Sequence, residues 1–386
     1  MTARPERGPR LALVAAFAVG AIVTLIAGLT WPLLSIRLEA AGHGGAAIGL
    51  STAAQTFAMV AVAPFIPRLA ARIGAIRLMV LSVVAGVVVL LSMAAWPGYA
   101  TWLAFRFLLG VCYEILFILS DAWVIQLAPE AKRGRVLGLY TSVALLGFAG
   151  GPIIIDLVGS QGWPPFVAGV GAMALTALPL WLARRHGPRA EGRPALGLLG
   201  FVRATPTIML AGAMYGFIDV IFLALFPVYA LHSGLDEESV ARLISTAIAG
   251  AIACQYGIGW LCDRLAPRPV LIGCTLTAMG CALALPIVIG TAWATVPVLV
   301  LWVGAMDGFF TIGMVMMGRR YKDIDLLAAN TVFVVMFGLG STAGPSVGGA
   351  AMDLWDPHGM VVVVVLVCLA FLPFAARRDA RPFEAP

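Results

Sequence analysis

The residues from Leu11 to Leu34 read LALVAAFAVGAIVTLIAGLTWPLL and contain no charged side chain. A helix of about 20 such residues crosses the hydrocarbon core of a bilayer, which is roughly 30 Å thick. Met79–Trp96 is a second continuous apolar run. A transmembrane barrel would instead show short segments of alternating polarity. Since lipid offers no hydrogen-bond partners to backbone N–H and C=O groups, these runs predict membrane-spanning helices.

The composition of the whole chain agrees with this interpretation. Of its 386 residues, 61% are hydrophobic and 11% are charged, whereas charged residues make up about 25% of a soluble domain. The basic segment Met1–Arg10 before the first apolar run raises the alternative of a cleaved signal peptide. That run is longer than the apolar core of a signal peptide and lacks a clear cleavage site, so we interpret it as the first spanning helix.

Charged residues, Gly/Pro clusters and short polar loops divide the chain into twelve apolar segments, each long enough to cross a bilayer. We predict spans at residues 11–36, 46–67, 77–96, 100–127, 134–158, 164–183, 207–231, 238–262, 269–290, 292–317, 326–352 and 359–376.

The distribution of basic residues predicts the orientation of these spans. If the N-terminus is cytoplasmic, 22 of the 25 Lys and Arg residues fall in cytoplasmic segments. Only Arg37 and Arg242 fall on the other side, and Arg106 lies within a span. Cytoplasmic loops of membrane proteins carry this excess of positive charge. We therefore expect an inner (plasma) membrane protein with both termini cytoplasmic, and we interpret the net charge of +6 as topology rather than nucleic-acid binding.

The chain also shows an internal repeat. Pro67–Arg72 follows the second span and Gly259–Arg264 follows the eighth, 192 residues later, while Gly150–Pro152 recurs as Ala343–Pro345 after 193 residues. Both offsets are close to half the chain length. We expect an all-α membrane protein of two pseudo-symmetric six-helix halves, residues 1–183 and 207–386, joined by a cytoplasmic linker at 184–206. Repeated halves with a site between them describe one large class of transporters.

Several motifs resemble those of the major facilitator superfamily. Gly259-Trp-Leu-Cys-Asp263-Arg264-Leu-Ala-Pro-Arg268 is similar to its G-x-L-x-D-R-x-G-R-R signature. The resemblance implies a latch at the cytoplasmic gate that uses Gly259, Asp263 and Arg264. The first-half copy keeps Arg72 and Gly74 but has Pro67 and Ala71 in place of the Gly and Asp, so the second-half latch is the better preserved.

Other motifs narrow the resemblance. Arg106-Phe-Leu-Leu-Gly110 is similar to a motif of proton-coupled members, and Gly147–Pro152 resembles a motif of exporters. Phe226–Ala230 and Gln255–Arg264, together with Arg133-Gly-Arg135, resemble the YcaD-like branch, close to drug–proton antiporters. The resemblance implies a fold without cofactor and a helix-packing role for Gly151, Pro152, Gly344 and Pro345.

Five ionisable residues lie within predicted spans: Arg106, Glu114, Asp121, Asp219 and Asp307. Burying one in lipid costs about 2.5–3.5 kcal/mol on insertion scales, so each is a candidate for proton coupling or substrate binding. In the resembled fold, spans one, four, seven and ten line the central cavity, and all five residues lie on spans four, seven and ten. Glu114 and Asp307 are 193 residues apart, which matches the repeat. We therefore expect them to face each other, one from each half.

Structural explanations compete with these functional ones. Arg106 can serve as a structural partner for a carboxylate or a helix end, and Asp121 can face water at the inner end of its span. Asp156 and Asp353 are expected at a membrane interface. Polar and aromatic residues nearby are candidates for lining the cavity, although aromatic residues in spans more often pack against lipid or protein. These candidates are Gln55, Tyr113, Trp123, Tyr215, Phe222, Phe309 and Asn330.

Other chemistries find little support in the sequence. The six Cys residues lack a CxxC pair, the four His residues fall in loops, and we expect no metal site. Gly338–Gly344 imitates a nucleotide-binding fingerprint but lies in an apolar span without a preceding strand. Asp236–Ser239 is acidic, and we expect it to cap the eighth span. We find neither a convergent nucleophile nor a metal set for an enzyme.

These observations favour an alternating-access transporter that exchanges protons for small amphipathic or cationic compounds, exports them and functions as a monomer. Glu114, Asp219 and Asp307 would carry protons or bind substrate, and Arg106 would adjust their proton affinity. Uptake or facilitated diffusion of a neutral or anionic nutrient is an alternative. A membrane enzyme, or a receptor with a transporter-like body, is a third.

Overall fold

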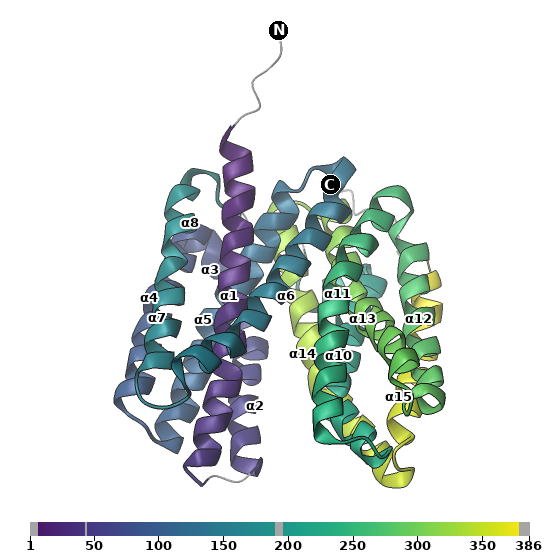
Figure 1. The fold of residues 1–386 in the computed structure, drawn as a ribbon. Helices are drawn as coiled ribbons and strands as arrows, with labels where there is room; N and C mark the ends of the chain where they lie inside the picture. The colour runs from purple at the N-terminus through teal and green to yellow at the C-terminus, as the bar shows by residue number, and fades with distance from the viewer. Residues whose placement is uncertain (1–6, 43–44, 190–195, 378–386) are drawn as a thin grey trace. The chain divides into compact units, whose positions relative to one another are not determined.

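The computed structural model describes residues 7–42, 45–189 and 196–377 (Figure 1). These residues form helices joined by short turns, without a strand among them, which confirms the predicted all-α class. The helices are α1 (Arg7–Ala40), α2 (Gly45–Val62), α3 (Ile66–Ile73), α4 (Ala75–Ala95), α5 (Tyr99–Leu127), α6 (Arg133–Val158), α7 (Pro164–Leu175), α8 (Ala177–Leu182), α9 (Leu198–Ala204), α10 (Pro206–His232), α11 (Glu237–Arg264), α12 (Pro267–Val288), α13 (Ala292–Arg320), α14 (Asp323–Leu354) and α15 (Gly359–Ala376). Single 3₁₀ turns lie at Ala63–Phe65, Glu130–Lys132 and Arg184–His186.

Within the described residues, eleven helical segments are long and apolar enough to cross a membrane. They correspond to all of the predicted spans except 46–67, which is helical but broken. Pro64 lies in the 3₁₀ turn after α2, and Pro67 lies in the first turn of α3. Proline lacks the N–H that continues a helix and is accepted in a first turn, so the segment ends and restarts here.

The predicted span 164–183 also consists of two helices. It divides into α7 and α8 at Thr176, whose N–H bonds the carbonyl of Met173 three residues back. Pro179 follows, and it cannot donate a hydrogen bond to the carbonyl of Leu175. The two pieces together still form one candidate span, Pro164–Leu182.

The helices form two compact units. The first unit comprises Met1–Ala128, Val143–Ala195 and Tyr321–Thr331, and the second comprises Pro129–Ser142, Leu196–Arg320 and Val332–Pro386. The helices α6 and α14 thus contribute their first residues to one unit and the remainder to the other.

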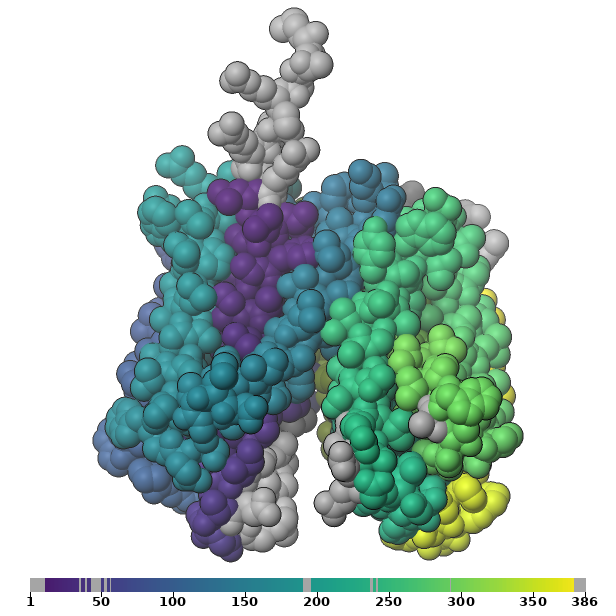
Figure 2. Space-filling view, viewed as in Figure 1, coloured from purple at the N-terminus to yellow at the C-terminus, as the bar shows by residue number. Residues whose placement is uncertain are grey.

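One packing scheme recurs in both units. In the first unit, α5 contacts α1, α2 and α4, and α7 contacts α1 and α4. In the second unit, α13 contacts α10, α11 and α12, and α15 contacts α10 and α12. Side chains of α7 and α8 fill the space beside α1 in the first unit (Figure 2). Each unit is therefore built around one central helix, α5 or α13, and these helices carry most of the intramembrane charges.

Glycines form equivalent close contacts between helices in the two units. Gly147 of α6 lies against the carbonyl of Ala21 of α1, and Gly340 of α14 lies against the carbonyl of Ala213 of α10. The two glycines are 193 residues apart and the two alanines 192. A Cβ at either glycine would collide with the facing backbone. Each unit therefore holds a pair of helices at backbone contact, a packing mode that small residues permit in membranes.

Candidate functional site

The first unit buries a guanidinium between two helices. Arg106 of α5 is 1% exposed. Its Nε donates to Gln55 Oε1 and its Nη1 to Ser51 Oγ of α2, each at 3.2 Å. Gly110, one turn along α5, lets α2 approach, because a Cβ there would lie 2.9 Å from the carbonyl oxygen of Gln55. Both of these hydrogen-bond partners are neutral, and Nη2 has no hydrogen-bond partner in the described part of the chain.

Two carboxyls follow on the same helix. Glu114 and Asp121 lie two turns apart on α5, and both are buried. Asp121 is 0% exposed, so the alternative in which it faces water is wrong. Tyr113 interacts electrostatically with both carboxyls and stacks on Phe117 at 5.7 Å. Glu114 Oε2 has no hydrogen-bond partner among the described residues.

The first turns of α14 complete this cluster. Asn330 Nδ2 donates to the carbonyl of Ile118 at 3.2 Å, between the two α5 carboxyls. A cavity of about 10 Å³ lies nearby, where Gln55 and Tyr113 meet apolar side chains of α1 and α7. A buried water needs about 10–15 Å³, so this cavity has room for about one water molecule.

In the second unit, one acidic residue lies on the central helix α13 and another on the neighbouring helix α10. Asp307 of α13 is buried and accepts a hydrogen bond from Tyr215 of α10. Asp219, one turn after Tyr215, interacts electrostatically with Asp307. The Tyr215 ring is held between Phe310 at 5.5 Å and Phe337 at 5.1 Å. In the part of the chain that the structure describes, Asp307 Oδ2 has no hydrogen-bond partner.

A chain of polar side chains leads along α13 from this pair. Thr311 lies one turn after Asp307, donates to Gln255 Oε1 at 2.7 Å and lies 3.2 Å from the hydroxyl of Thr141 of α6. Gln255 Nε2 donates to the carbonyl of Gly304 at 3.3 Å. Nothing in the sequence distinguishes Thr141 and Thr311, since single threonines within spans commonly bond their own helix.

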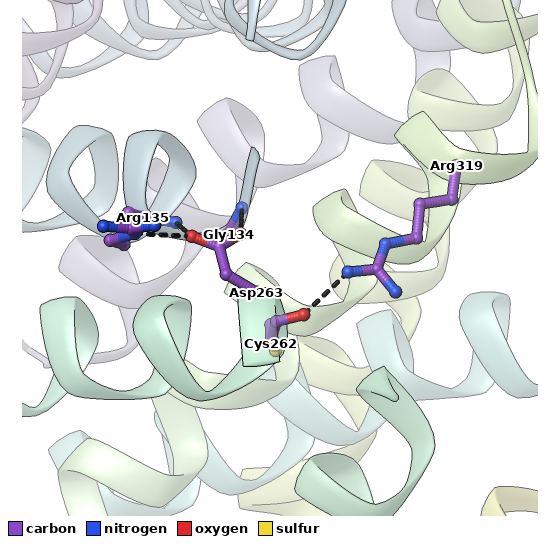
Figure 3. Close-up of polar contacts among 5 residues, drawn as sticks. All are labelled: Gly134, Arg135, Cys262, Asp263 and Arg319. Carbon is purple, nitrogen blue, oxygen red and sulfur yellow. Dashed lines mark hydrogen bonds and ion pairs between the residues drawn. The ribbon is translucent and has the colours of Figure 1, made fainter. Parts of the chain in front are cut away.

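Figure 3 shows the contacts of the latch motif, all within the second unit. Asp263, at the end of α11, is 3% exposed at its side chain. It accepts hydrogen bonds from the N–H of Gly134 at 2.7 Å, and from the N–H and Nε of Arg135 at 3.1 and 2.8 Å. Its charge thus faces the N-terminus of α6, which favours an anion. Arg319 of α13 donates to the neighbouring carbonyl of Cys262 at 2.7 Å.

The rest of this motif has separate contacts. Gly259 lies against the carbonyl of Gly134, so α11 and α6 approach at backbone distance. Arg264 lies 4.0 Å from the centre of the Trp260 ring rather than on a neighbouring helix. In the first-half copy, Arg72 ends α3 on the surface, and Gly74 adopts φ 89° as it joins α3 to α4. That conformation favours glycine.

Three residues expected to line a cavity lie in packing positions instead. Trp123 Nε1 donates to the carbonyl of His186, at the start of the linker, at 2.7 Å. Phe222 stacks on Phe226 at 5.2 Å and lies 6.0 Å from Trp302. Phe309 meets Phe371 of α15 edge-to-face at 5.9 Å. Helical position alone cannot tell a cavity-facing ring from one that fills the interior of a unit.

The acidic segment before α11 caps the helix, as expected. Asp236 accepts hydrogen bonds from Ser239 N at 3.2 Å and Ser239 Oγ at 2.6 Å. These bonds hold the pKa of Asp236 below its ordinary value. The six cysteines are free. Among the described residues, no group of three or more His, Cys, Asp or Glu side chains is placed to hold a metal ion.

Known proteins with similar sequences and folds are transporters. The family model described as Major Facilitator Superfamily matches residues 16–317. An uncharacterized MFS-type transporter YfkF of Bacillus subtilis is 26% identical over 359 residues, 88% of each chain. An uncharacterized MFS-type transporter of Yersinia pestis is 24% identical over 292 residues, 72% of each chain.

Two solved structures show how closely the fold agrees. The transporter FucP in the outward conformation gives a TM-score of 0.76 at 17% identity, over 96% of this chain and 98% of its own. The human organic anion transporter MFSD10 (TETRAN) gives 0.77 at 16% identity, over 96% and 100%. Taken with the match to the family model, the repeated packing and the span count, these findings place the chain in the major facilitator superfamily, as a multi-pass membrane transporter of small molecules.

Proposed function

We propose that this transporter exchanges protons for amphipathic or cationic compounds by alternating access and exports them. The observation that carries this proposal is the pair of Asp307, buried on α13, and Asp219, half-buried on α10, with Tyr215 as a neutral partner. A carboxyl buried without a cation is stable only when it holds a proton or a cationic ligand. Proton and cation then compete for one group, which is the requirement for antiport.

Glu114 extends the same chemistry to the first unit, where its Oε2 lacks a partner among the described residues. We assign Glu114, Asp219 and Asp307 to proton or substrate binding, with Arg106 as the residue that adjusts the proton affinity of Glu114. The resemblance to the YcaD-like and drug–proton antiporter branch supports this assignment.

The remaining assignments follow the same proposal. The contacts of Asp263 with Gly134 and Arg135 form the cytoplasmic latch. The mobile halves comprise residues 1–183 and 207–386, joined by the linker 184–206, and the monomer is the working unit. Both termini are cytoplasmic, in the inner or plasma membrane of a bacterium.

The test uses purified full-length protein in liposomes that contain a pH-sensitive dye. With an acidic interior, addition of an organic cation such as ethidium or tetraphenylphosphonium should release protons from the lumen. We expect Asp307→Asn and Glu114→Gln to lose this release, while Asp353→Asn, an exposed residue in the last turn of α14, behaves as the original protein. Unchanged coupling in both Asp307→Asn and Glu114→Gln would refute the assignment.

A second candidate function, transport of an anionic solute, is favoured by one observation. Arg106 is buried with two neutral partners, and its Nη2 lacks an acceptor among the described residues. A buried guanidinium is an effective partner for a carboxylate. If this function is correct, benzoate should raise the unfolding temperature of the protein but not of Arg106→Gln, whereas benzylammonium should raise neither. If benzylammonium alone stabilises the protein, the result would favour a cationic substrate over an anionic one.

A further inference from the structure

In each unit, a basic side chain at the end of one helix contacts the turn that follows a later helix. Arg37 lies in the last turn of α1 and His232 in the last turn of α10. Arg37 contacts the turn between α6 and α7, and His232 contacts the turn between α14 and α15. The two clasps have the same topology within their own units but differ in chemistry.

In the first unit, Arg37 contacts groups that do not titrate. Arg37 Nε donates to the carbonyl of Ser160 at 2.6 Å, and Nη2 donates to the carbonyl of Gly162. Its guanidinium lies 4.8 Å from the centre of the Phe166 ring. Arginine stays charged in proteins, and carbonyls and aromatic rings do not titrate. This clasp therefore has the same strength across physiological pH.

The clasp of the second unit is made of two titratable groups. His232 Nδ1 lies 2.7 Å from Oδ1 and 2.9 Å from Oδ2 of Asp356. Both side chains reach water, with 49% and 54% of their surface exposed. An ionised carboxylate only accepts hydrogen bonds, so Nδ1 carries a hydrogen in this contact. A second proton gives the ring a positive charge, so the contact becomes an ion pair and the attraction to the carboxylate increases.

Histidine is the side chain that ordinarily changes charge between pH 5 and 8. We propose that His232 and Asp356 form a proton-binding site that fastens α10 to the turn between α14 and α15 when this face of the membrane is acidic. By the distribution of Lys and Arg, this is the face expected outside the cell. Because α10 carries Tyr215 and Asp219, proton binding at its end acts on the helix that supplies the partners of Asp307. The site goes beyond the transport proposal above and does not depend on it.

Other charged groups at this end of the second unit have their own contacts or lie one turn away. Asp236 accepts a hydrogen bond from Ser239 Oγ and interacts electrostatically with Arg242. Asp353 lies in the last turn of α14. His358 is the group that most needs a control, because its ring lies 6.0 Å from the rings of both Tyr229 and Trp355. Among the described side chains, the contact of His232 is with Asp356.

Trp355 offers a local probe, since it directly precedes Asp356 and is 60% exposed. The full chain would be labelled with 5-fluorotryptophan, placed in phosphatidylcholine–phosphatidylglycerol nanodiscs and studied by ¹⁹F NMR, with Trp355→Phe to assign the signal. We expect the Trp355 signal to shift between pH 8 and pH 5.5 in the original protein and in His358→Gln. The shift should be absent in His232→Gln, Asp356→Asn and His232→Arg.

A second measurement separates a proton-dependent contact from a purely structural one. A double-mutant cycle on the unfolding temperature, with His232→Gln and Asp356→Asn, should give a coupling of roughly 1–3 °C at pH 6 that falls by at least half at pH 8. With His232→Arg in place of the histidine, the coupling should be equal at both pH values, as for Arg37. A Trp355 shift that survives in His232→Gln, or a coupling independent of pH in the original protein, would overturn the proposal.

Discussion

Asp263 accepts three hydrogen bonds from the first residues of α6 while its side chain is almost fully buried. A buried carboxylate of this kind depends on every donor, because an unsatisfied charge in the interior is costly. Arg264, the adjacent residue of the same motif, contacts the ring of Trp260 on its own helix. Neighbouring residues of one motif thus have different roles, which motif spacing alone does not separate.

The contacts of Asp263 predict an asymmetry between two substitutions. Asp263→Asn removes the charge and turns one acceptor into a donor that faces N–H groups, so we expect a loss of about 1–3 kcal/mol in unfolding free energy. Arg264→Gln removes only a surface cation–π contact, which is worth about 0.5–1 kcal/mol. Thermal unfolding in nanodiscs measures both. Equal effects of the two substitutions would contradict the separation of roles.

Asp236 gives a prediction of pH dependence outside the membrane. Its pKa is lowered by the hydrogen bonds from Ser239, so the folded state binds this proton more weakly than the unfolded state. The stabilisation by the cap is therefore complete above the ordinary aspartate pKa of about 3.9 and is lost as the pH falls through the lowered value. The unfolding temperatures of Asp236→Ala and the original protein should differ at pH 7 and converge in strong acid. A constant difference would show that the cap acts without its charge.

At the scale of elements, the closest helix pairs are set by glycines on α6 and α14. Each of these helices also contains a proline, Pro152 or Pro345, directly after a glycine that packs on the partner helix. Gly151 faces the backbone of Gly28 and Leu29, and Gly344 faces the carbonyl of Phe217. Backbone contact of this kind leaves no room for a side chain, so it constrains sequence more strictly than ordinary packing.

Two glycines of α14 test this constraint within one helix. A Cβ at Gly340 would lie 2.9 Å from the carbonyl carbon of Ala213 and the nitrogen of Phe217, whereas a Cβ at Gly349 would meet no atom within 4 Å. Gly340→Ala should therefore destabilise the protein by about 1–3 kcal/mol through overpacking. Gly349→Ala should leave stability unchanged or raise it slightly, because alanine favours helix. Unfolding in the same nanodiscs would show whether the two variants differ; equal stability would refute the packing argument.

At the scale of the whole molecule, the distribution of charge predicts how the chain crosses the membrane. The twelve predicted crossings would place both termini and the linker on the cytoplasmic side, and the His232–Asp356 contact on the other side. Reporter fusions check this directly: green fluorescent protein at the C-terminus should fluoresce, and alkaline phosphatase fused after Pro357 should be active. Active phosphatase at residue 189, within the linker, would contradict the orientation.

The all-α membrane class, the family and the position of nearly every span can be predicted from the sequence alone, because apolar length and basic loops are local properties of the chain. The sequence also located the intramembrane charges and the cap at Asp236. It did not reveal the breaks at Thr176 and after α2, since isolated prolines are compatible with a continuous span.

Which side chains contact one another is seen only in the folded structure. It paired Arg106 with Gln55 and Ser51, Asp307 with Tyr215 and Asp219, and Asp263 with the start of α6. Trp123, Phe222 and Phe309, which were expected to line a cavity, make packing contacts. Such partners lie on different helices, and their distances depend on how those helices cross rather than on spacing along one of them. For that reason the continuous apolar run with which the sequence begins identifies a membrane helix, but the residues it contacts are set by the folded chain.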